Sequence, residues 1–102
     1  MALKACDYQG ACETSDIRDA ISYATRYGAK VINLSLGGPD DGPEGQAFEA
    51  TVNEAQKAGV VVVTSAGNDA MDVGEYAPAN ATYSPAVAAH RSDGRICGFS
   101  NY

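Results

Sequence analysis

Four consecutive valines, Val60 to Val63, restrict the fold of this chain more than any other feature of its sequence. Valine is branched at Cβ and favours extended backbone, and apolar side chains on both parities of a strand indicate burial of both its faces. The segment Val31 to Leu36 is also strand-like, and its first four residues are apolar apart from Asn33. Both segments are therefore predicted to be strands buried on both faces, as in a parallel sheet.

Helical patterns precede both of these segments. In the first, apolar residues recur at the i, i+3, i+4, i+7 spacing of one helical face, namely Ile17, Ala20, Ile21 and Ala24. Ser15 and Asp16 are suited to cap its first turn, and Gly28 to end it. The second helix is expected from about Gln46 to Ala58, after a loop from Gly37 to Gly45 that is too rich in glycine and proline for helix or sheet interior.

The remaining segments complete an alternating order of strands and helices. A short strand is expected at Ala2 to Ala5, and two more at Ala86 to Ala89 and Ile96 to Phe99. This order predicts an α/β fold, a β-α-β-α-β segment of an open parallel sheet with right-handed crossovers and a short β-rich C-terminal part. If both helices cover one face, the other face is bare, and the isolated chain should be poorly soluble or partly molten.

Length, charge and hydropathy limit the function classes. The 102 residues allow one domain or a piece of one. A net charge of −6 without any Lys/Arg cluster argues against nucleic-acid or anionic-membrane partners, which need a positive face. No stretch approaches the ~20 apolar residues that span a bilayer, and this chain carries no visible export signal.

The three cysteines are too few and too scattered for a disulfide framework or a zinc site. Cys6 and Cys12 can bridge only if a loop brings them together, so buried or unpaired thiols, Cys97 included, are the simpler expectation. The cysteines therefore do not indicate whether the protein resides in an oxidising or a reducing compartment.

Two strand exits carry the residues of chemical interest. Ligands of open parallel sheets bind beyond the carboxyl ends of the strands, which points to Ser35 to Gly38 and Ser65 to Asn68, expected to lie side by side. Phosphate binding is disfavoured, because the glycine-rich loop matches no phosphate motif, has no lysine and holds Asp40, Asp41 and Glu44.

Two interpretations of these exits remain. In the first, the glycines serve as turn residues only, with an ordinary turn asparagine beside them. In the second, the site performs acyl transfer, since the Asn68 amide is a neutral donor suited to an oxyanion and Gly67 leaves space for a substrate backbone.

The combination of segments favours the second interpretation. The stretches Ala29 to Gly38 (AKVINLSLGG), Gly59 to Asn68 (GVVVVTSAGN) and Gly98 to Tyr102 (GFSNY) occur in this order, with a helix between the first two. They resemble the substrate-binding strand, the oxyanion-hole segment and a later strand of subtilisin-like serine proteases, the subtilase or peptidase S8 family. The resemblance covers essentially the whole chain and implies that residues 1–102 are part of a subtilase catalytic domain, with its three-layer-type sheet.

The resemblance implies roles for seven residues. Asn68 would donate its side-chain amide to the oxyanion. One wall of the pocket for the residue before the scissile bond would be formed by Ser35, Leu36 and Gly37, which would also pair with the substrate backbone as an added strand. The other wall would be formed by Ser65, Ala66 and Gly67. Small residues on both walls imply room for a large apolar side chain.

No residue of a catalytic triad is identified. The family's motifs D-[ST]-G, H-G-[TS]-H-V and G-T-S-[MA]-[AS]-x-P do not occur in this sequence. His90 is expected in a surface turn, and Ser92 and Ser100 lack the glycine-framed elbow of a nucleophile. The chain is therefore interpreted as a piece of a serine endopeptidase that lacks the N-terminal Asp/His part and the C-terminal Ser part. It is expected to be inactive alone. The alternative is a non-catalytic peptide-binding or pseudoprotease fragment of the same fold.

The resemblance also implies partners and surroundings. The substrate would be a peptide or protein, the rest of the domain would be required for activity, and the protein would be secreted. No cofactor is required for the chemistry, and a structural calcium ion in the full domain is compatible with the family, although its ligands are unknown. The acidic loop at Asp40, Asp41 and Glu44 is expected to be a solvated loop.

Overall fold

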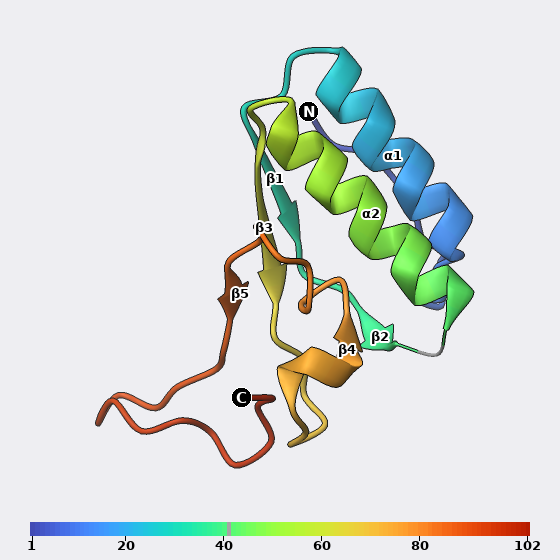
Figure 1. Ribbon diagram of the computed structural model, residues 1–102. Coiled ribbons are helices and arrows are strands. Elements are labelled where there is room, and N and C mark those ends of the chain that lie inside the picture. Colours follow the sequence, from blue (N-terminus) through green and yellow to red (C-terminus); the bar gives the residue numbers. More distant parts are fainter. Residues whose placement is uncertain (41) are drawn as a thin grey trace.

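The computed structural model describes residues 1–40 and 42–102, so Asp41 lies outside the described residues. The chain forms a small sheet with two helices, followed by an irregular C-terminal region (Figure 1). In chain order the elements are α1 (Thr14–Arg26), β1 (Val31–Leu34), β2 (Gly38–Pro39), α2 (Pro43–Lys57), β3 (Val61–Ser65), the 3-10 helix η1 (Val73–Glu75), β4 (Tyr76–Ala77) and β5 (Ala86–Val87).

Three parallel strands form the sheet in the order β1-β3-β5. Val31 pairs with Val61 and Leu34 with Thr64, so β1 and β3 run in register along their common length. Strands β2 and β4 form a separate antiparallel pair, in which Pro39 lies opposite Tyr76. The predicted α/β class with a parallel sheet is confirmed.

Both helices pack on the same face of the sheet (Figure 1). They meet the buried side of the strands in one apolar core, whose members include Ile17, Ile21, Leu34, Phe48, Val52 and Val62. On the opposite face Val31 is 62% exposed and Val61 47% exposed. The prediction that these strands are buried on both faces is therefore wrong for this chain, because α1 and α2 both lie on the first face (Figure 1).

The ends of the two helices agree only in part with the sequence prediction. Helix α1 is preceded by Glu13, without a side-chain cap bond, so Ser15 and Asp16 do not have the predicted capping role. Its end is as predicted, since Gly28 has φ 83° and donates its N–H to the Thr25 carbonyl at 3.3 Å. Helix α2 begins at Pro43, before the expected Gln46, because proline fits the first helical turn, where no N–H is needed.

Two predicted strands are absent. Residues 2–5 and 96–99 form no ladder, although Cys6 makes an isolated bridge with Cys12, and Ile96 one with His90. Their short apolar runs satisfied the sequence pattern, but a strand also needs a neighbour with which to exchange backbone hydrogen bonds. No helix in the described part of the chain is long and apolar enough to cross a membrane.

Candidate active site

The two strand exits leave the same edge of the sheet. Because β1 and β3 are parallel neighbours, paired up to Leu34 and Thr64, the segments that follow them start side by side. The expected juxtaposition of Ser35 to Gly38 with Ser65 to Asn68 is thereby confirmed at the level of the backbone. Ser35, Gly37 and Asn68 are exposed there, whereas Ala66 and Gly67 are buried.

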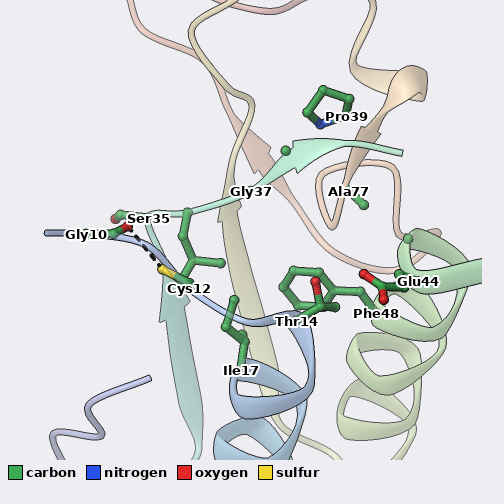
Figure 2. A pocket seen from close by; sticks show the side chains of 13 residues that line it. Gly10, Cys12, Thr14, Ile17, Ser35, Gly37, Pro39, Glu44, Phe48 and Ala77 are labelled. Atoms are coloured by element: carbon green, nitrogen blue, oxygen red, sulfur yellow. Dashed lines mark hydrogen bonds between the residues drawn. The ribbon is translucent and has the colours of Figure 1, made fainter. Parts of the chain in front are cut away.

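A groove of about 430 Å³ runs along the first exit (Figure 2). Ser35, Leu36 and Gly37 line it, together with Gly38 and Pro39 of β2. Its apolar side includes Ile17 of α1 and Phe48 of α2, and Glu44 is a further lining residue. The groove does not include Ser65 to Asn68, so the second predicted wall lies outside it.

A disulfide supports the loop on the far side of this groove. Cys6 and Cys12 are bonded, so the expectation of unpaired thiols is wrong for this pair, whereas Cys97 is free. A turn brings them together: Asp7 donates its N–H to the Ala11 carbonyl at 2.8 Å, and its Oδ1 accepts from the Ala11 N–H at 2.9 Å. Cys12 and Gly10 both line the groove.

Tyr76 lies between the two exits, a position that sequence reasoning missed. A Cβ placed on Gly37 would lie 2.8 Å from Tyr76 Cε1, and one placed on Gly67 would lie equally close to the same atom. The ring is therefore packed against both glycines, and only 9% of the residue is exposed. Burial raises the pKa of Tyr76 above its ordinary value of 10.0, and the negative charge of Asp69 raises it further.

Asn68 sits in the loop directly after β3, and among the described residues its side-chain amide has no hydrogen-bond partner. Gly67, before it, has φ 107°, a conformation that favours glycine. Asn101, which is fully buried, forms hydrogen bonds with the backbone of this loop. Sequence reasoning singled out the segment around Asn101 but gave this residue no role, because its contacts span some thirty residues of sequence.

The acidic loop is only partly as expected. Asp40 accepts a hydrogen bond at 2.8 Å from the Asn80 side-chain amide, and its second carboxylate oxygen is buried, so it is not a solvated acid. Asp41 lies outside the described residues. Glu44 is exposed, as expected. Among the residues that the structure describes, no three His, Cys, Asp or Glu side chains gather to bind a metal ion.

His90 and Ser100 both lie in the C-terminal region, where His90 forms an isolated bridge with Ile96 rather than the predicted turn. His90 is exposed in the C-terminal loop, with Nδ1 at 2.8 Å from the Arg91 carbonyl. Ser100 is 2% exposed, and its hydroxyl accepts from the Ala89 N–H at 2.9 Å. Neither side chain lines the groove described above.

Comparison with known proteins places this arrangement in a wider group. Residues 1–102 match the model of the subtilase family. The chain is 41% identical to a thermophilic serine proteinase of Bacillus sp. (strain AK1), over all of this chain and 24% of that protein. It is 35% identical to an extracellular serine proteinase of Thermus sp. (strain Rt41A), over 98% of this chain and 24% of that protein. With an extracellular protease of Xanthomonas campestris pv. campestris the identity is 39%, over 86% of this chain and 17% of that protein.

A solved structure has the same fold. The crystal structure of a cold adapted subtilisin-like serine proteinase superposes with a TM-score of 0.89 at 25% identity, covering 97% of this chain and 36% of that one. The chain thus spans about a quarter or less of the length of the three relatives named above.

Proposed function

Because this chain belongs to the subtilase family, we propose that it supplies the substrate-binding strand and the oxyanion donor of a secreted serine endopeptidase. The observation that carries the proposal is the adjacency of the two strand exits, one lining a groove and the other presenting Asn68. The proposal treats residues 1–102 as part of a larger catalytic domain, since the named relatives contain several times this length.

In the proposed mechanism Asn68 stabilises the tetrahedral intermediate. Nucleophilic attack on a peptide carbonyl turns its oxygen into an anion, and a fixed amide donor lowers the energy of that anion more than that of the ground-state carbonyl. Asn68 is suited to this role because its amide is exposed and makes no hydrogen bond to the described residues. An amide also donates without a proton transfer, so its contribution does not depend on the pH near neutrality.

The first exit is proposed to bind the substrate backbone. Ser35 and Gly37 are exposed at the end of an ordered strand and line the groove, an arrangement suited to adding an extended peptide as a further strand. Leu36 would contribute an apolar contact beside it. The second exit, Ser65 to Gly67, would form the opposite wall of the pocket next to the scissile bond, with the Tyr76 ring between the walls.

The nucleophile, base and orienting carboxylate are proposed to come from outside these 102 residues, so the isolated chain is expected to be inactive. Export is proposed because relatives from Thermus and Xanthomonas are named extracellular. The Cys6–Cys12 disulfide supports this, since such bonds persist in oxidising compartments. No cofactor is proposed for the chemistry, and a structural calcium ion is left to the rest of the domain.

The test uses the protein encoded by the natural gene, including the sequence that flanks this segment. The protein is incubated with a fluorophosphonate probe, which labels activated serines, and with fluorogenic peptides. Asn68→Ala is expected to lower kcat by about 100- to 1000-fold, the loss known for such a donor in subtilisin, with little change in KM.

Asn53→Ala is the matched control, because Asn53 lies on α2 and its amide bonds Glu49. It should leave kcat unchanged. A wild-type protein that binds peptides but neither reacts with the probe nor cleaves them would replace the enzyme with the non-catalytic alternative. An active wild-type protein whose kcat is unaffected by Asn68→Ala would exclude the oxyanion role.

A further inference from the structure

We infer that Asn101 is a positioning residue for the oxyanion donor: its buried side chain fixes the backbone just after Asn68, and its backbone N–H holds the carbonyl of the residue just before it. This inference rests on the proposed role of Asn68. It concerns a residue that follows Asn68 by more than thirty positions and that does not line the groove described above.

The first part of the argument is the hydrogen bonding around Asn68. The Asn101 Oδ1 accepts from the backbone N–H of Asp69 at 2.8 Å and from that of Met71 at 3.2 Å. The backbone N–H of Asn101 donates to the Gly67 carbonyl at 3.1 Å. The residue before Asn68 and the residue after it are therefore both bonded to Asn101, while the Asn68 side chain remains unbonded among the described residues.

The second part is the set of backbone hydrogen bonds made by the residues next to Asn101 in the chain. Ala70 donates to the Phe99 carbonyl at 3.0 Å, Tyr102 donates to the Met71 carbonyl at 3.1 Å, and Val73 donates to the Tyr102 carbonyl at 2.9 Å. Segment 99–102 thus holds the outgoing part of the loop through its backbone. Asn101 adds bonds on either side of Asn68: its side chain accepts from Asp69 and Met71, and its backbone N–H donates to the Gly67 carbonyl.

The third part is the fit between Asn101 and Gly67. A Cβ on Gly67 would overlap Asn101 Nδ2, closer than any side chain tolerates. The amide nitrogen is buried and has no hydrogen-bond partner among the described residues. The position thus requires an acceptor for two backbone N–H groups rather than a donor, and Asn101 supplies that acceptor at 0% exposure.

A donor that must meet a developing anion has to be fixed beforehand, because a shift of about 1 Å can cost a hundredfold in rate. Removing the Asn101 side chain would leave the Asp69 and Met71 amides without their acceptor and free the loop to relax. The ground-state peptide bound along Ser35 to Gly37 would be little affected. The expected signature is a loss in kcat without a matching rise in KM.

The experiment is a double-mutant cycle in the full-length protein, with Asn101→Ala, Asn68→Ala and both changes together. Asn101→Ala should lower kcat by about 10- to 100-fold and alter KM by less than about threefold. In the Asn68→Ala background it should cost less than about threefold more, because the donor it positions is already absent. Ser100→Ala is the control: Ser100 is also buried, but its hydroxyl bonds the Ala89 N–H and the Asn101 carbonyl, so kcat should stay near the wild-type value.

Asn101→Asp is a second variant that keeps the proposal testable if Asn101→Ala does not fold, since a carboxylate still accepts hydrogen bonds from the Asp69 and Met71 amides. A folded Asn101→Asp protein should keep kcat within about tenfold of wild type, and thermal unfolding of each variant checks the fold. If Asn68→Ala itself leaves kcat unchanged, the proposed function fails. If Asn68→Ala lowers kcat but the two losses multiply, or folded Asn101→Asp loses as much as Asn68→Ala, the positioning role is overturned.

Discussion

Gly67 is packed tightly against the side chains of Asn101 and Tyr76. Its φ of 107° disfavours any side chain, and a Cβ would also overlap both neighbours. Gly67→Ala in the full-length protein is expected to lower the free energy of unfolding by more than about 3 kcal/mol, measured by chemical denaturation.

Gly94→Ala separates the cost of the positive φ from the cost of the close contacts. Gly94 has a similar positive φ of 82°, but nothing lies within 4 Å of the place that a Cβ would take there, so only the backbone strain applies. Its cost should be about 1 kcal/mol. Equal costs for the two variants would mean that the contacts of Gly67 with Asn101 and Tyr76 yield without penalty.

Tyr76 should make the stability depend on pH in the alkaline range. Its pKa is raised in the folded state by burial and by Asp69, so above pH ~10 the unfolded chain loses this proton first and is favoured. The stabilisation is present below pH ~10 and is lost as the pH rises through the folded-state pKa. Tyr76→Phe should therefore flatten the alkaline decline in the free energy of unfolding, measured from about pH 8 to about 11.

Tyr83→Phe is the matched control, because Tyr83 is 61% exposed. Its alkaline profile should follow that of the wild type. A Tyr76→Phe profile with the wild-type decline would assign the pH dependence to other groups.

At the residue scale, sequence reasoning found what is local and missed what is not. Gly67 and Asn68 follow a strand directly, so their position at the sheet edge can be predicted from the strand itself. Tyr76 reaches the site only because β4 pairs with β2, and Asn101 only because the C-terminal segment returns to the loop after β3. Neither contact leaves a periodic signal in the sequence.

At the scale of the elements, the turn that the Cys6–Cys12 disulfide closes is predicted to shape one side of the groove. The short loop closed by the disulfide should contribute about 2 kcal/mol to stability in the chain-entropy account. Changing both cysteines to alanine in the full-length protein should raise KM for extended peptides more than it lowers kcat, because Gly10 and Cys12 line the groove together with the substrate strand. Steady-state kinetics with peptides of increasing length would measure this.

Cys97→Ser is the control for that variant, since Cys97 is free and lies outside the groove. Its KM should be unchanged. A dithiol reductant should reproduce the KM increase in the wild type and have no further effect on the double variant. An unchanged KM in the double variant would restrict the disulfide to a stabilising role.

The elements themselves were largely readable from the sequence. The apolar spacing in α1 and the unalternated valines of β3 each specify a period, so helix and strand could be predicted. The start of α2 was misjudged because Pro43 is a breaker inside a helix but a favourable first residue. The disulfide was missed because its formation depends on the turn at Asp7, whose bonds to Ala11 are visible only in three dimensions.

At the scale of the whole molecule, the exposed sheet face opposite the helices is expected to determine how the isolated chain unfolds and whether it aggregates. Val31 and Val61 lie exposed on that face, and both helices are on the other (Figure 1). The isolated 102-residue chain is expected to bind a hydrophobic dye and to unfold without a sharp transition, measured by dye fluorescence and calorimetry. A sharp cooperative transition of the isolated monomer would contradict this prediction.

Paired substitutions test the cause. Val31→Thr with Val61→Thr should reduce dye binding and aggregation of the isolated chain, because these side chains lie on the bare face. Val62→Thr, at 0% exposure in the core, should increase both. Right-handed crossovers in sequential strand order already implied that one face of the sheet is exposed. The valines at odd and even positions wrongly indicated that both faces are buried.

The hydrogen bonds between Asn101 and the loop after β3 also have a consequence for the order of events during synthesis of the chain. A ribosome makes Asn68 before Asn101, at about 5 to 20 residues per second. While segment 99–102 is still unmade, the loop lacks the acceptor for Asp69 and Met71 and the donor to Gly67. The loop that carries Asn68 can therefore be fixed by Asn101 only after some thirty further residues have been made, whereas the strand pairing of β1 with β3 needs none of them.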